Sequence, residues 1–105
     1  MAFGRIIAEA RRKAGLSQKD LAARILKEDS LPISPQYLND LERDRRNPPS
    51  GHLLRQLARE LDLSEEYLAF TAGQYPDDLQ DDSYQPEQVE AAFRAFRRTL
   101  RGQDQ

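Results

Sequence analysis

The sequence predicts an all-α protein, with a compact bundle of five helices followed by an additional C-terminal helix. Three observations support this fold class. Apolar residues recur at spacings of three and four, which is the period of an amphipathic helix. A serine precedes four of the expected helices, where its hydroxyl can accept from the first backbone N–H groups. Glycine and proline interrupt the pattern at the expected boundaries.

Two helices are expected at the start of the chain. The first spans residues 3–14, with basic residues in its last turn and Gly15 as its stop. The second begins after Ser17, which together with Asp20 forms a near relative of the capping box. It is expected to run to about Lys27. Its predicted core-facing residues are Leu21, Ala22, Ile25 and Leu26.

The third helix is expected after a loop at residues 28–33. Ser34 is its predicted N-cap, and Pro35 suits its first position, where an N–H has no helical partner. Leu38 and Leu41 fall on one side of this helix and are expected to face the core. A proline pair then breaks the chain.

Two further helices complete the expected bundle. Ser50 is the predicted N-cap of the fourth and Ser64 that of the fifth, which Gly73 closes. The fourth has an apolar stripe of Leu53, Leu54, Leu57, Ala58 and Leu61. Residues 1–73 are therefore assigned to one helical domain.

Residues 74–85 are rich in proline, aspartate, glutamine and serine, which predicts an acidic, solvated linker. Residues 86–105 form the C-terminal element, with a helix that opens at Pro86 and runs to about Arg101. Its apolar stripe, with the spacing of a helix-packing seam, consists of Val89, Phe93, Phe96 and Leu100. This stripe is a candidate dimer seam, and the alternative is that it packs on the core of its own chain.

The composition excludes several classes of site. The 105 residues suffice for one small domain. Cysteine is absent, which excludes disulfides and thiolate metal sites, and the single His52 argues against histidine-based catalysis or metal binding. No nucleophile–base pairing or phosphate-binding glycine loop is recognisable, so we expect neither an enzyme nor a cofactor. No apolar run reaches ~18 residues, which predicts a cytoplasmic protein without a membrane partner.

Charge is unevenly distributed along the chain. The net charge is −2, yet residues 1–46 hold ten basic side chains against seven acidic ones. Residues 47–85 hold two against eight. The N-terminal part is therefore basic, as expected of a surface that meets nucleic acid, and the acidic middle conceals this in the total.

The third helix carries the functional prediction. Two short helices followed by the arginine cluster Arg43, Arg45 and Arg46 are typical of a helix-turn-helix that docks on DNA. Opposite the buried leucines, the third helix presents Gln36, Asn39, Asp40 and Arg43. A glutamine near the start of a docked helix can hold adenine by two hydrogen bonds, with a discrimination of ~1–3 kcal/mol. The alternative is an ordinary solvated helix face.

Three blocks of the sequence resemble the Cro/C1-type helix-turn-helix family, the Xre-like bacterial and phage repressors. These blocks are Arg11–Leu21, Ser34–Pro48 and Leu57–Leu68, and the resemblance extends over residues 3–73. It implies a compact five-helix domain whose second and third helices form the motif, with the third in the major groove. It also implies a dimer on paired half-sites, because one short recognition helix gives limited affinity.

The resemblance and the exposed face of the third helix together imply three groups of residues. The candidates for base contact are Pro35, Gln36, Asn39, Asp40 and Arg43. The candidates for contact with the DNA backbone are Gln18, Lys19, Ser34, Tyr37, Arg45 and Arg46. Arg11 and Glu42 match a structural pair that ties the first helix to the end of the third.

The chain departs from the family pattern at three places. The connection between the second and third helices is several residues longer than usual, which leaves open both the docking angle of the third helix and any extra backbone contact from Lys27. Asp40 stands where a base-reading glutamine is common. It either accepts from cytosine N4 or repels phosphates, unless Arg43 one turn ahead compensates. Asp44 replaces a frequent glycine, so a different backbone is expected there.

These features favour a sequence-specific binder of double-stranded DNA that acts as a dimeric transcriptional repressor on an operator. The second hypothesis is a protein-interaction module, an antitoxin or adaptor with the same fold, whose C-terminal helix or linker docks a partner. The expected partners are DNA, a second copy of the chain and, in the second hypothesis, a regulatory protein.

Overall fold

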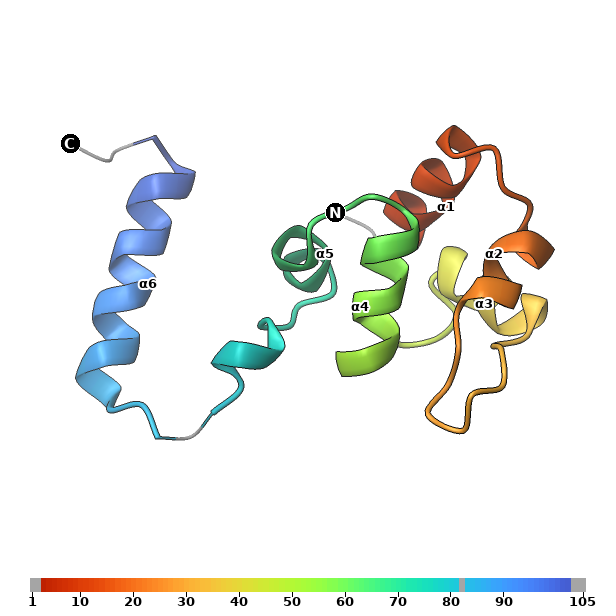
Figure 1. Ribbon diagram of the computed structural model, residues 1–105. Coiled ribbons are helices and arrows are strands. Elements are labelled where there is room, and N and C mark those ends of the chain that lie inside the picture. The colour runs from red at the N-terminus through yellow and green to blue at the C-terminus, as the bar shows by residue number, and fades with distance from the viewer. Residues whose placement is uncertain (1–2, 82, 103–105) are drawn as a thin grey trace.

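The computed structural model describes residues 3–81 and 83–102, and this part of the chain is all-α, as predicted. The elements are α1 (Phe3–Lys13), α2 (Gln18–Arg24), α3 (Pro35–Glu42), α4 (Gly51–Glu60), α5 (Glu65–Thr71), the 3-10 turn η1 (Asp77–Leu79) and α6 (Pro86–Leu100). Figure 1 shows α1 to α5 gathered into one body, with α6 standing apart from it. Asp82, assigned to the acidic linker, lies outside the described residues.

The core of the body is formed by the apolar faces that the helical spacing predicts. Helix α3 packs against both α1 and α2, and α4 packs against α5. The largest fully buried side chains are Ile7, Leu21, Ile25, Leu38, Leu41, Leu57 and Leu68. Because each of the five helices or its immediate flank contributes to this set, burial of their apolar faces holds them in one cluster.

The serine caps are confirmed at three of the four predicted positions. Ser17 Oγ accepts from the Asp20 N–H at 2.9 Å and the Ser17 N–H donates to Asp20 Oδ2 at 3.2 Å, which is a reciprocal capping box. Ser34 and Ser64 cap α3 and α5. Ser50 precedes α4 but forms no side-chain capping bond. The next residue, Gly51, has a left-handed φ of 59°, which turns the chain away from the usual capping geometry.

Helix α2 is shorter than predicted. It ends at Arg24, and the next three residues are extended rather than helical. Leu26, predicted to face the core, is 39% exposed and pairs with Pro32 in an isolated β-bridge. The expected loop at 28–33 is therefore one arm and the turn of a small hairpin over residues 25–33.

The segment after α5 is more ordered than a featureless spacer. It contains the turn η1, and Asp77 forms an ion pair with Arg55 of α4. Helix α6 has no buried residue. Two of its aromatic rings nevertheless contact the preceding chain. The ring centres of Phe96 and Phe70 of α5 lie 6.0 Å apart, and those of Phe93 and Tyr75, in the segment after α5, lie 6.2 Å apart, both in edge-to-face geometry. Among the residues described, no helix is long and apolar enough to cross a membrane.

Candidate nucleic-acid interface

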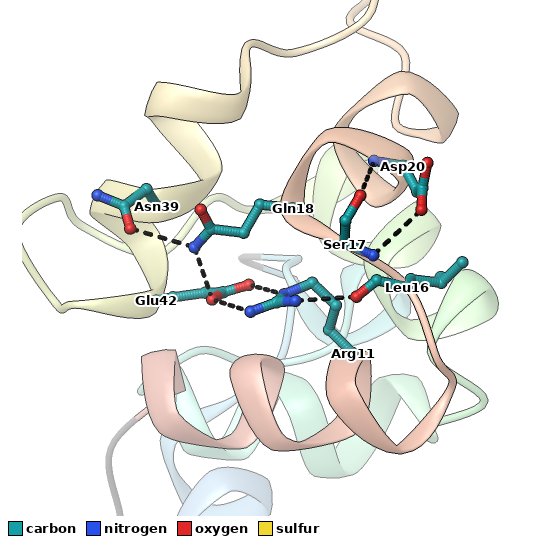
Figure 2. A network of polar contacts seen from close by, with 7 residues as sticks. All are labelled: Arg11, Leu16, Ser17, Gln18, Asp20, Asn39 and Glu42. Atoms are coloured by element: carbon teal, nitrogen blue, oxygen red, sulfur yellow. Dashed lines mark hydrogen bonds and ion pairs between the residues drawn. The ribbon is translucent and has the colours of Figure 1, made fainter.

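The position of α3 is fixed by the side-chain pair that the sequence predicted as structural. Arg11 Nε donates to Glu42 Oε2 at 2.7 Å, and Arg11 Nη2 donates to Glu42 Oε1 at 3.0 Å. Arg11 Nη1 also donates to the carbonyl oxygen of Leu16 at 2.8 Å. The guanidinium thus joins α1, the turn before α2 and the end of α3, as Figure 2 shows.

Gln18 belongs to the same network. Its Nε2 donates to Glu42 Oε1 at 2.9 Å and to Asn39 Oδ1 at 3.1 Å. Figure 2 shows the Gln18 amide lying between these two residues of α3. An amide nitrogen carries two hydrogens, so both donors of this side chain face protein acceptors rather than a phosphate. This arrangement differs from the phosphate contact expected of the side chain.

The outward face of α3 is polar, as the helical spacing predicts. Leu38 and Leu41 are buried, whereas Pro35, Gln36 and Arg43 are exposed and Asn39 is half-buried. Asn39 has its Oδ1 turned to Gln18, and Figure 2 shows its nitrogen pointing away from the network. This face therefore offers amide groups whose orientation the protein itself controls.

Asp40 is engaged with a residue one turn earlier on α3. Its Oδ1 accepts from Gln36 Nε2 at 3.0 Å. Residues three or four apart on a helix are neighbours on its surface, so Gln36 and Arg43 both lie within reach of Asp40. The carboxylate in this structure orients the glutamine that is the first candidate for base reading.

The close contact of Gly4 with the end of α3 was not predicted. Gly4 lies so near α3 that a methyl group there would meet the carbonyl oxygens of Leu41 and Glu42, the latter at 2.5 Å. Asp44 has a left-handed φ of 58°, and its Oδ1 accepts from the Gly4 N–H at 3.1 Å. Aspartate tolerates this conformation, so the loss of the frequent glycine requires no different backbone.

The expected backbone-contacting residues lie on α2, at the start of α3 and in the segment after it. Lys19 and Arg45 are exposed, and the guanidinium of Arg46 lies 5.0 Å from the ring centre of Tyr37. Ser34 uses its hydroxyl to accept from the Tyr37 N–H at 3.0 Å. Cationic groups thus follow the end of α3, and one of them lies over the ring of Tyr37. No cluster of three potential metal ligands occurs among residues 3–81 and 83–102.

Comparison with known proteins agrees with this geometry. A family model described as helix-turn-helix matches residues 7–68, which is more than half of the chain. The chain belongs to the Cro/C1-type helix-turn-helix family. This membership indicates a DNA-binding regulator rather than an enzyme. No curated protein matches the sequence.

A solved structure of a complex of a SinR protein with a SinI protein contains a chain of the same fold. It superimposes with a TM-score of 0.52 at 22% identity, over 98% of this chain and 94% of that chain. At this identity the likeness shows the fold alone. It nevertheless covers the segment after α5 as well as the Cro/C1-type domain.

Two residues that order the motif, Gln56 and Gly4, could not be recognised from the sequence. Gln56 of α4 accepts from the Leu26 N–H at 2.8 Å through its Oε1, and its Nε2 donates to the Leu26 carbonyl oxygen. A glutamine on the half-exposed side of an amphipathic helix gives no signal of such a partner. The same holds for Gly4, which looks like an ordinary helix residue in the sequence.

Proposed function

We propose that the chain is a sequence-specific DNA-binding repressor that occupies an operator as a dimer, with α3 in the major groove. The observation that carries this proposal is the polar outer face of α3, which the Arg11–Glu42–Gln18 network holds in a fixed orientation. A reading helix must keep its side chains in register with base edges, and a rigid attachment serves that purpose.

Gln36 and Asn39 are the proposed base readers. A glutamine or asparagine amide can donate to adenine N7 and accept from N6, and each such pair contributes ~1–3 kcal/mol of discrimination. Asp40 holds the Gln36 amide, and Gln18 holds the Asn39 amide. Both amides are therefore already ordered before DNA binds, which reduces the conformational entropy lost on binding. In this proposal Asp40 acts by orienting Gln36, with acceptance from cytosine N4 as its other role.

Arginines and lysines around α3 are the proposed contacts to the DNA backbone. Arg43, Arg45 and Lys19 are exposed, and Arg46 is held against the Tyr37 ring. Such contacts position the protein without reading sequence. Because the Gln18 donors are engaged within the protein, we assign to Gln18 the orientation of Asn39 rather than a phosphate contact.

A dimer is proposed because one short helix contacts too few base pairs for a specific operator. Helix α6 offers the surface, since none of its residues is buried and its exposed apolar residues follow a seam spacing. A second copy of α6 would cover this stripe and add burial that the monomer lacks.

The test is a selection from randomised duplex DNA by the purified protein, followed by sequencing, at several salt concentrations. The proposal predicts a two-fold symmetric motif and an affinity that falls steeply with salt. Reporter expression from a promoter overlapping that motif then measures repression. Failure to enrich any motif at low salt would contradict the proposal.

A protein-interaction module is the second candidate function. The observation that favours it is an open apolar cleft of about 790 Å³ between the linker and α6, lined by Tyr75, Leu79, Tyr84, Val89 and Phe93 among others. The structural neighbour is itself a complex of two proteins. This function predicts a complex that survives high salt and depends on Phe93 and Phe96 but not on Gln36.

A further inference from the structure

The hairpin between α2 and α3 is a rigid element. Its arms are joined by hydrogen bonds from the Lys27 N–H to the Leu31 carbonyl oxygen at 2.8 Å and from the Ile33 N–H to the Ile25 carbonyl oxygen at 2.9 Å. Gln56 of α4 then bonds to both the N–H and the carbonyl oxygen of Leu26. Figure 1 shows this segment extending away from α2 and α3. The hairpin therefore holds Lys27 in a defined place relative to α3.

A surface pocket of about 480 Å³ opens between the hairpin and α3. It is lined by Lys27, Pro32, Ile33, Ser34, Tyr37, Arg46 and Leu53. Two cationic side chains from separate segments thus converge on it, and the described lining contains no carboxylate. In the hairpin turn, Asp29 Oδ1 accepts from the Leu31 N–H at 3.0 Å.

The position of Arg46 in this pocket is also constrained. Its guanidinium lies 5.0 Å from the centre of the Tyr37 ring, and a guanidinium over an aromatic face is attracted electrostatically to it. Tyr37 lies on α3, while Arg46 follows that helix in the chain. The pocket therefore combines a guanidinium held against Tyr37 of α3 with the Lys27 side chain of the hairpin.

We propose that the hairpin is an additional DNA-contacting arm, and that Lys27 and Arg46 bind one backbone phosphate in this pocket. This inference rests on the proposed function. The occupant is a DNA phosphate because the pocket has two positive charges and adjoins Ser34, at the start of α3. A phosphate there would lie on the strand that flanks the major groove occupied by α3.

The experiment measures fluorescence anisotropy with the selected duplex and a scrambled duplex, across ~50–200 mM salt. It compares the wild-type protein with Lys27→Gln, Lys27→Arg and the control Arg59→Gln. Arg59 is an exposed cation on α4, so its substitution removes the same charge away from the pocket. Circular dichroism verifies that the exposed substitutions leave the fold intact.

Lys27→Gln is expected to reduce the slope of log affinity against log salt by about 0.9, the value for one lost phosphate contact. When the salt concentration rises fourfold, the affinity of the wild-type protein should therefore fall by a factor about threefold larger than that of Lys27→Gln. The reduction should be equal on both duplexes, and Lys27→Arg should restore the slope.

Two results would overturn the inference. A slope for Lys27→Gln equal to that of the wild-type protein, or a change no larger than that of Arg59→Gln, removes the hairpin from the interface but leaves the proposed function standing. Absence of DNA binding by the wild-type protein overturns the proposed function and the inference together.

Discussion

Arg11 of α1 and Glu42 of α3 are joined by two hydrogen bonds, and their side chains are only 11% and 4% exposed. The hydrogen bonds that Arg11 donates to Glu42 raise the pKa of the Arg11 guanidinium above its ordinary value, so Arg11 stays charged. Through Gln18 the same carboxylate is linked to Asn39. One buried ion pair thus connects the helix scaffold to a candidate base reader.

Removal of one partner of this pair should be strongly destabilising, because it leaves the other charge buried without compensation. Arg11→Ala is expected to lower the free energy of unfolding by about 3–5 kcal/mol, measured by urea denaturation. The control is Arg5→Ala, whose ion pair with Glu9 is 79% and 63% exposed and should change stability by less than about 1 kcal/mol. Equal losses for the two variants would contradict the structural role of Arg11.

Gly4→Ala should be destabilising although alanine is the better helix former. The added methyl group would meet the carbonyl oxygens of Leu41 and Glu42, which are backbone atoms and cannot rotate away. We expect a loss of roughly 1–3 kcal/mol or more, as for other overpacked sites. Gly15→Ala is the comparison, since its added methyl group meets no atom within 4 Å and only its φ of 74° opposes the change. A gain in stability for Gly4→Ala would refute the close approach of α1 to α3.

The capping box at the start of α2 should be visible in the titration of Asp20. The hydrogen bonds from Ser17 hold the pKa of the Asp20 carboxyl below its ordinary value. Because the folded pKa is depressed, this contribution to stability is present above the unfolded pKa and is lost as pH falls through the folded one, below about pH 4. In NMR titrations Ser17→Ala should raise the Asp20 pKa, while that of the distant Asp81 stays unchanged.

The proposed base and backbone contacts should respond differently to substitution. Gln36→Ala is expected to relax sequence preference at one position of the selected motif, by about 1–3 kcal/mol. Arg45→Ala should weaken binding to all sequences and reduce the salt slope by about 1. Both are read from binding titrations on the selected and single-base-changed duplexes. Unchanged binding in both variants would remove this surface from the interface.

The apolar stripe of α6 should control the oligomeric state. Replacement of Phe93 and Phe96 by serine is expected to shift the protein from dimer to monomer in sedimentation equilibrium, with a parallel loss of operator affinity. Arg94→Ala, an exposed change on the same helix, should leave the dimer intact. A wild-type protein that sediments as a monomer, even on operator DNA, would contradict the dimer proposal.

The helices could be predicted because their signals are local. The Ser17 capping box, Pro35 at the first position of α3 and the apolar period of α4 all depend on residues within a turn or two. The extension of α2 to Lys27 was wrong for a complementary reason. Its apolar residues fit a helix, but cross-strand bonds with residues 31–33 hold them extended.

The sequence by itself determined the all-α fold, the helix-turn-helix motif, the outer face of α3 and the pairing of Arg11 with Glu42. Tertiary structure alone decided which atoms meet across the helices. Gln18 faces Asn39, Asp44 accepts from Gly4, and Gln56 holds the hairpin, each over more than twenty residues of chain. The helical propensity of a segment depends on neighbouring residues in the sequence, whereas the hydrogen-bond partner of an amide or a carboxylate depends on how separate helices pack.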